Sequence, residues 1–90
     1  MSDQTQHYFH QVEAHILMAA LTSYEWSRRP VSASQVLAFQ DYYCSARSVL
    51  HWLDHLAEQQ ILERVGKRTR FIPAKPVKEI KAMLRQQGRA

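Results

Sequence analysis

The spacing of apolar residues along the chain predicts a mainly helical protein. Between residues 7 and 27 they recur every three or four positions, which is typical of a helix with one buried face. This stripe comprises Phe9, Val12, Ile16, Leu17, Ala20, Leu21 and Tyr24. Pro30 lacks a backbone donor and disfavours the helical conformation at Arg29, so the sequence predicts that the first helix ends in "RRP".

Two further helices are predicted from their N-terminal capping signals. Ser32 offers a side-chain acceptor and Gln35 stands where a capping box needs Glu or Gln, which predicts a short second helix over about 33–40. We interpret residues 41–44 as a turn. Ser45 is a second N-cap signal, and a third helix is predicted over about 46–59. Its inward face is predicted to carry Val49, Trp52, Leu53 and Leu56.

After residue 60 the pattern changes to β-branched and aromatic residues on both sides of a glycine, which predicts a β-hairpin. A two-residue turn at 66–67 would set Leu62 opposite Phe71 and Glu63 opposite Arg70. Two prolines then end the hairpin, and a last helix with a basic outer face is predicted over 76–88. Its apolar stripe comprises Val77, Ile80, Met83 and Leu84.

Length and composition indicate one folded domain. Ninety residues suit a single hydrophobic core, here predicted over 7–73, with the basic helix 76–88 added to it. No apolar run is long enough to span a membrane, and the first residues lack the pattern of a signal peptide, so we expect a soluble, cytoplasmic protein. Cys44 is the single cysteine, which excludes a disulfide or a cysteine zinc site within the chain.

Charge is distributed unevenly along the chain. The net charge is +4, yet residues 1–27 contain three acidic residues and no lysine or arginine. From residue 64 to the last residue there are nine lysines and arginines against one acid, a local net charge of +8. This asymmetry favours a polyanionic partner, and the alternative is a basic tail that serves solubility alone.

The order of these elements, with three short motifs, resembles the winged helix-turn-helix family over roughly residues 31–72. The motifs are "SASQV" from Ser32, "SARSVLHWLDHL" from Ser45 and "QILER" from Gln60. The resemblance implies a mainly α fold of three helices, a small β-hairpin or wing, and a C-terminal helix. Two features depart from the family pattern: the turn containing "DYYC" is longer, and Gln60 replaces the usual glycine after the recognition helix.

The resemblance implies that the third helix enters the major groove of DNA and that the wing contacts phosphates or the minor groove. Arg47 is the residue expected to grip guanine, because an arginine presents two parallel donors. Ser45 and the helix N-terminus would hold a phosphate, and small neighbours would permit close approach. The candidate DNA-binding residues are Ser45, Ala46, Arg47, Ser48, His51, Arg64, Lys67, Arg68 and Arg70. Arg70 is alternatively paired with Glu63 across the hairpin.

Other residues permit competing interpretations. His51 and His55 are spaced to share a metal, but "HWLDH" lacks the glutamate of H-E-x-x-H, so we interpret them as solvated or DNA-facing and expect no metal. Cys44 beside two tyrosines is interpreted as a buried plug rather than a redox sensor. The last helix is expected to pack on the first helix, of the same chain or of a second copy in a homodimer.

Two functions follow as expectations. The first is sequence-specific binding of double-stranded DNA by a small bacterial or mobile-element transcriptional regulator. The alternative is a protein-interaction module in a replication or inhibitor complex, using Leu50, Tyr42 and Tyr43 as an exposed apolar patch. No nucleophile elbow, Walker loop or paired carboxylates are present, so we expect no catalysis, no cofactor, no small-molecule substrate and no membrane partner.

Overall fold

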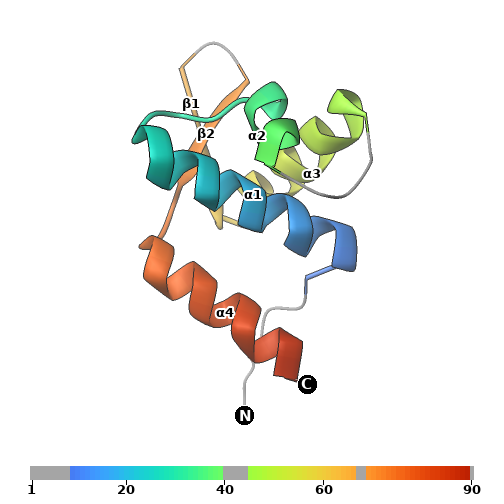
Figure 1. Ribbon diagram of the computed structural model, residues 1–90, viewed down its shortest axis with the longest axis vertical. Helices are drawn as coiled ribbons and strands as arrows, with labels where there is room; N and C mark the ends of the chain where they lie inside the picture. Colours follow the sequence, from blue (N-terminus) through green and yellow to red (C-terminus); the bar gives the residue numbers. More distant parts are fainter. Residues whose placement is uncertain (1–8, 40–44, 67–68, 90) are drawn as a thin grey trace.

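The computed structural model describes residues 9–39, 45–66 and 69–89. The fold is mainly helical with one antiparallel hairpin, arranged as in a winged helix (Figure 1). In chain order the elements are α1 (Gln11–Ser27), α2 (Ala33–Phe39), α3 (Ala46–Glu58), β1 (Leu62–Val65), β2 (Arg70–Pro73) and α4 (Val77–Arg89). Within these ranges, no helix combines the length and the apolar character that crossing a membrane requires.

The start of α1 corrects the predicted helix over 7–27. Phe9 and His10 are not helical, and the helix begins at Gln11 because His10 is its N-cap. Nδ1 of His10 accepts a hydrogen bond from the Val12 amide at 3.2 Å, and the His10 amide donates to Oε1 of Glu13 at 3.2 Å. The apolar stripe nevertheless extends before the helix, since the side chain of Phe9 is fully buried.

The other helix boundaries lie close to the predicted ones. After α1, Arg28 takes a left-handed conformation and its amide donates to the Tyr24 carbonyl at 2.7 Å. Before α2, the Ser32 amide donates to Oε1 of Gln35 at 2.9 Å, which confirms the predicted capping box. Gln60 follows α3 with a φ of 64°, the left-handed position that costs a residue other than glycine about 1 kcal/mol.

The hairpin forms where predicted, but its register is shifted by two residues. Leu62 pairs with Pro73, Glu63 with Ile72, Arg64 with Phe71 and Val65 with Arg70. The strands are therefore joined by the four residues 66–69 instead of a two-residue turn, and the predicted Glu63–Arg70 pairing is wrong. A shift of two residues leaves every side chain on the same face of the hairpin, so the apolar pattern does not distinguish the two registers.

The connection between α1 and α2 joins the hairpin through one residue. Val31 and Phe71 form an antiparallel bridge in which each amide donates to the other carbonyl, at 2.8 and 2.9 Å. Both residues are buried in a core to which all six elements or their connections contribute. Its members are Phe9, Ile16, Leu17, Ala19, Ala20, Leu21, Val31, Val36, Val49, Leu53, Leu56, Ile61, Leu62, Phe71 and Ile80.

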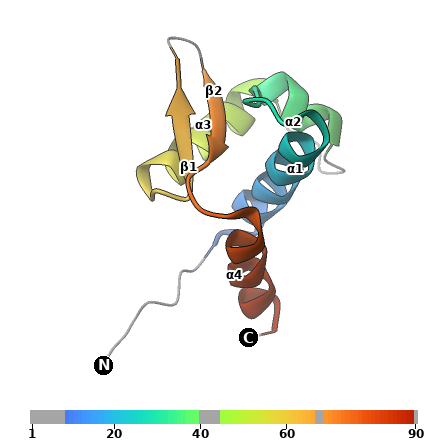
Figure 2. The same ribbon diagram turned by 90° about the vertical axis from the view of Figure 1, so that its left-hand side faces the viewer.

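α4 packs against α1 at one end of the molecule. Ile80 is fully buried, and Nζ of Lys81 lies 2.9 Å from Oε1 of Glu25 on α1. Figure 1 and Figure 2 both show α4 at the opposite end of the long axis from the turn end of the hairpin, where β1 ends and β2 begins. The basic last helix and this end of the wing therefore lie on different parts of the surface.

Candidate nucleic-acid interface

The first turn of α3 exposes the residues predicted to read DNA. Ser45 caps the helix, because its Oγ accepts a hydrogen bond from the Ser48 amide at 3.2 Å. Ala46, Arg47 and His51 are exposed, whereas Ser48 is half-buried. Arg47 forms no ion pair with any residue that the structure describes. The cap that orders this turn uses the Ser45 hydroxyl, so a phosphate here would have to bind the free amides instead.

The inner face of α3 is largely as predicted. Val49, Leu53 and Leu56 are fully buried. Trp52 is only half-buried, and its ring stacks on His10 with centroids 5.1 Å apart. Leu50, which was predicted to be exposed, is half-buried and packs against the core. The apolar patch proposed for a protein partner therefore loses Leu50, and its other members, Tyr42 and Tyr43, lie outside the described residues together with Cys44 and the predicted turn.

The charges on the outer face of α3 change sign along the helix. Arg47, His51, Asp54 and Glu58 follow one another at intervals of four, three and four, and so form one stripe. The stripe begins with a cation in the first turn and ends with two carboxylates in the last turns. A polyanion is therefore attracted to the N-terminal half of α3 and repelled by the C-terminal half.

Arg64, predicted to contact DNA from the wing, is exposed but already paired within the protein. Because both backbone groups of Phe71 pair with Val31, the Arg64–Phe71 pair lacks mutual hydrogen bonds, and the side chains of such pairs lie closer together. Cζ of Arg64 accordingly lies 5.6 Å from the centre of the Phe71 ring, and Nη2 forms an ion pair with Oδ1 of Asp54. The guanidinium therefore links the hairpin to α3.

A further wing cation, Arg70, lies at the turn end of the hairpin, where β1 ends and β2 begins. Arg70 is exposed, stands opposite Val65 and has no ion pair among the described residues. Lys67 and Arg68, predicted to be the strongest wing contacts, lie outside the described part of the chain. Figure 1 and Figure 2 show that the first turn of α3 lies toward the same end of the molecule as the turn end of the hairpin, where β1 ends and β2 begins. Both lie away from α4.

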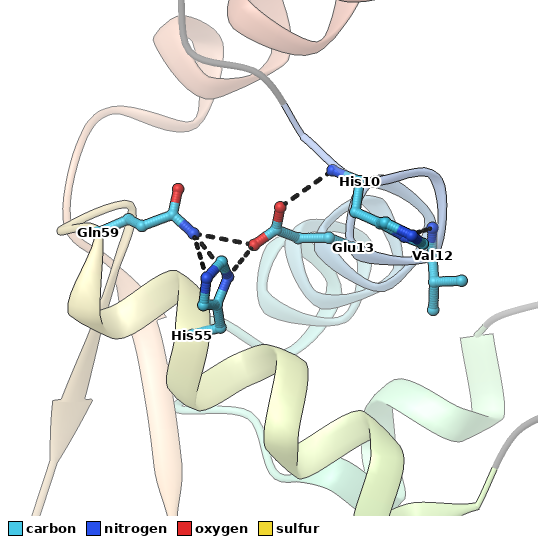
Figure 3. Close-up of polar contacts among 5 residues, drawn as sticks. All are labelled: His10, Val12, Glu13, His55 and Gln59. Atoms are coloured by element: carbon cyan, nitrogen blue, oxygen red, sulfur yellow. Dashed lines mark hydrogen bonds and ion pairs between the residues drawn. The ribbon is translucent and has the colours of Figure 1, made fainter.

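A polar network behind α3 was not predicted. Glu13 of α1 is 1% exposed, and its Oε2 accepts hydrogen bonds from Nδ1 of His55 at 2.6 Å and from Nε2 of Gln59 at 3.1 Å (Figure 3). Its other oxygen accepts the amide of His10 that starts α1. His55 was interpreted as solvated or DNA-facing. Its ring instead turns back toward α1. Nδ1 of His55 therefore holds the last turn of α3 against Glu13 and does not face DNA.

The sequence carries a signal for the burial of Glu13. Position 13 lies four residues after Phe9 and three before Ile16, within the apolar stripe of α1. A carboxylate at such a position is buried by its neighbours and must find hydrogen-bond donors. Asp54 carried no comparable signal, because its partner Arg64 is brought to it only by the packing of the hairpin.

Comparison of the chain with protein-family models, with curated proteins and with solved structures found no match.

Proposed function

We propose that this chain binds double-stranded DNA sequence-specifically and acts as a transcriptional regulator of the winged helix-turn-helix type. In this proposal α3 enters the major groove with its first turn, and the hairpin region 64–70 contacts phosphates or the minor groove. The observation that carries the proposal is Arg47, an exposed arginine in the first turn of α3 with the small residues Ala46 and Ser48 beside it. Small neighbours let the helix approach base edges closely enough for a bidentate contact.

The distribution of charge supports the same orientation. Asp54 and Glu58 repel phosphates from the C-terminal half of α3, so a duplex is guided toward Arg47 and His51. Arg70 stands at the turn end of the hairpin, where it can follow the phosphate backbone next to the groove. The helix α4 lies at the other end of the molecule, so the proposed interface does not include it.

Replacing Arg47 by alanine is expected to relax the preferred sequence at one base pair, with a loss of discrimination of about 1–3 kcal/mol. Selection of bound sequences from a random duplex pool, for wild type and variant, measures this change. Lys78→Ala is the matched control, since it also removes one positive charge from an exposed position, here on α4. Lys78→Ala should leave the selected sequence intact. The proposed docking is wrong if Arg47→Ala selects the same sequence as wild type.

A protein-interaction module remains the second candidate, and it is favoured by exposed apolar side chains on α1 and α2. Trp26 is 79% exposed, and Phe39 is 45% exposed. A salt titration of wild-type binding to random duplex DNA separates the two functions. Binding in the micromolar range that weakens steeply with salt supports the first, and no binding at low salt supports the second.

We also propose that the chain forms a homodimer through α1 and α4. Met18, Lys81, Leu84 and Arg85 line a hollow along the seam of these helices, and Met18 is 43% exposed. Trp26 lies two turns further along α1 and remains exposed. A two-fold contact covers such apolar residues on both copies at once and matches the symmetry of palindromic DNA sites.

Met18→Asp is expected to raise the dimer dissociation constant by roughly tenfold or more, because it sets a charge in the proposed contact. Sedimentation velocity across a concentration series measures the constant. Phe39→Asp is the control, since Phe39 is equally exposed but belongs to α2. Equal effects of the two variants, or a wild type that stays monomeric at all concentrations, would contradict this interface.

A further inference from the structure

We propose that Asp54 is a specificity-determining residue that keeps Arg64 from contacting DNA at random sequences. This inference rests on the proposed DNA-binding function. Asp54 lies on the same stripe of α3 as Arg47, seven residues further on, so the two side chains are separated by about 10 Å along the helix. The phosphates border a major groove about 12 Å wide, so a residue about 10 Å from the base contact lies near them. In this proposal Asp54 therefore lies beside a duplex that Arg47 holds.

The contacts of Arg64 explain how Asp54 acts. The guanidinium is paired with Asp54, lies over the ring of Phe71, and shares a surface hollow with Asp54, Ala57 and Glu58. Within that hollow one cation faces two carboxylates, so its local charge is negative. In the free protein the Asp54 carboxylate therefore occupies the position that a phosphate oxygen would take on Arg64.

The pair is exposed enough to exchange partners. The side chains of Arg64 and Asp54 are 49% and 40% exposed, and ion pairs at such positions are weak. A phosphate replaces Asp54 only where other contacts already hold the duplex against the negative charge of Asp54 and Glu58. Base contacts from the first turn of α3 hold the duplex in this way at the preferred sequence. On random DNA these base contacts are missing.

Neutralising the carboxylate tests this directly. Asp54→Asn is expected to raise the affinity for random duplex DNA by about three- to tenfold, because it frees Arg64 for one added phosphate contact. The slope of log affinity against log salt should steepen by about 0.9 for the same reason. Affinity for the preferred sequence should rise less, so the ratio of specific to random binding falls.

Three further variants separate release of Arg64 from a general change in charge. Glu79→Gln removes an exposed acid on α4 and should leave random-duplex affinity unchanged. Arg64→Ala alone should change it little, since Asp54 already occupies this arginine. The double variant Asp54→Asn/Arg64→Ala should lose the gain of Asp54→Asn and its added salt slope.

The outcomes distinguish this inference from the proposed function. A wild type that binds no duplex at low salt overturns DNA binding itself. A wild type that binds DNA, with an Asp54→Asn variant of unchanged random-duplex affinity and salt slope, overturns the role of Asp54 alone. A double variant that keeps the full gain also overturns it, because the effect would then not pass through Arg64.

Discussion

Replacing Phe71 by alanine is expected to lower the free energy of unfolding by about 3–5 kcal/mol. Phe71 is fully buried, its backbone pairs with Val31, and Arg64 lies over its ring. The substitution leaves a cavity where the hairpin, the α1–α2 connection and α3 meet, and these rigid elements cannot collapse to fill it. Urea unfolding followed by circular dichroism measures the loss.

Ile72→Ala is the matched control for this substitution. Ile72 is the next residue of β2, faces the other side of the hairpin and is only half-buried. It should therefore lose less than half as much stability as Phe71→Ala. Equal losses would contradict this prediction. They would mean that the buried ring of Phe71 contributes no more to the free energy of unfolding than the half-buried side chain of Ile72.

Replacing Glu13 by alanine is expected to lower the free energy of unfolding by about 2–3 kcal/mol, since it removes the buried, charged acceptor of three hydrogen bonds. The donors are the amide of His10, Nδ1 of His55 and Nε2 of Gln59. His55 is 46% exposed, so water compensates part of its loss, whereas the capping interaction at the start of α1 is lost outright. The same urea experiment reports the effect.

Glu25→Ala tests whether burial, and not charge, determines this effect. Glu25 is also on α1 and pairs with Lys81, but its side chain is 44% exposed. Its removal should cost less than about 1 kcal/mol, as is usual for an exposed ion pair. Glu13→Gln keeps an acceptor oxygen and the shape of the side chain, and should fall between the two. A loss for Glu25→Ala as large as that for Glu13→Ala would contradict the assigned role of the buried network.

The helices were predictable because their signals are local. The apolar stripes, the Ser32 and Ser45 caps and the break before Pro30 each lie within one or two turns, and they set the bounds of α2 and α3 closely. The start of α1 differs from the prediction because histidine is not among the usual N-cap residues, although Glu13 at the third helical position completes its capping box. The hairpin register was missed because the apolar pattern is the same for both loop lengths.

The candidate interface was predictable only for properties that depend on the position of a single residue within its helix. Exposure of Arg47 and His51 follows from the helical period, and the structure has both on the outer face of α3. The partners of Arg64 and His55 depend on which elements pack together, since Glu13 and His55 are 42 residues apart in the chain. The sequence therefore indicates which residues are exposed on the candidate interface, but not which of their charges are already paired within the protein.

The Val31–Phe71 bridge also affects how the protein avoids aggregation. A two-stranded hairpin has two open edges, and each is a template for pairing with another chain. The bridge occupies the edge of β2 at Phe71, while β1 is short, carries the charged residues Glu63 and Arg64 and is tied to α3 by the Arg64–Asp54 ion pair. These features make both edges poor templates for strand addition, so self-association of this fold through an extended sheet is disfavoured.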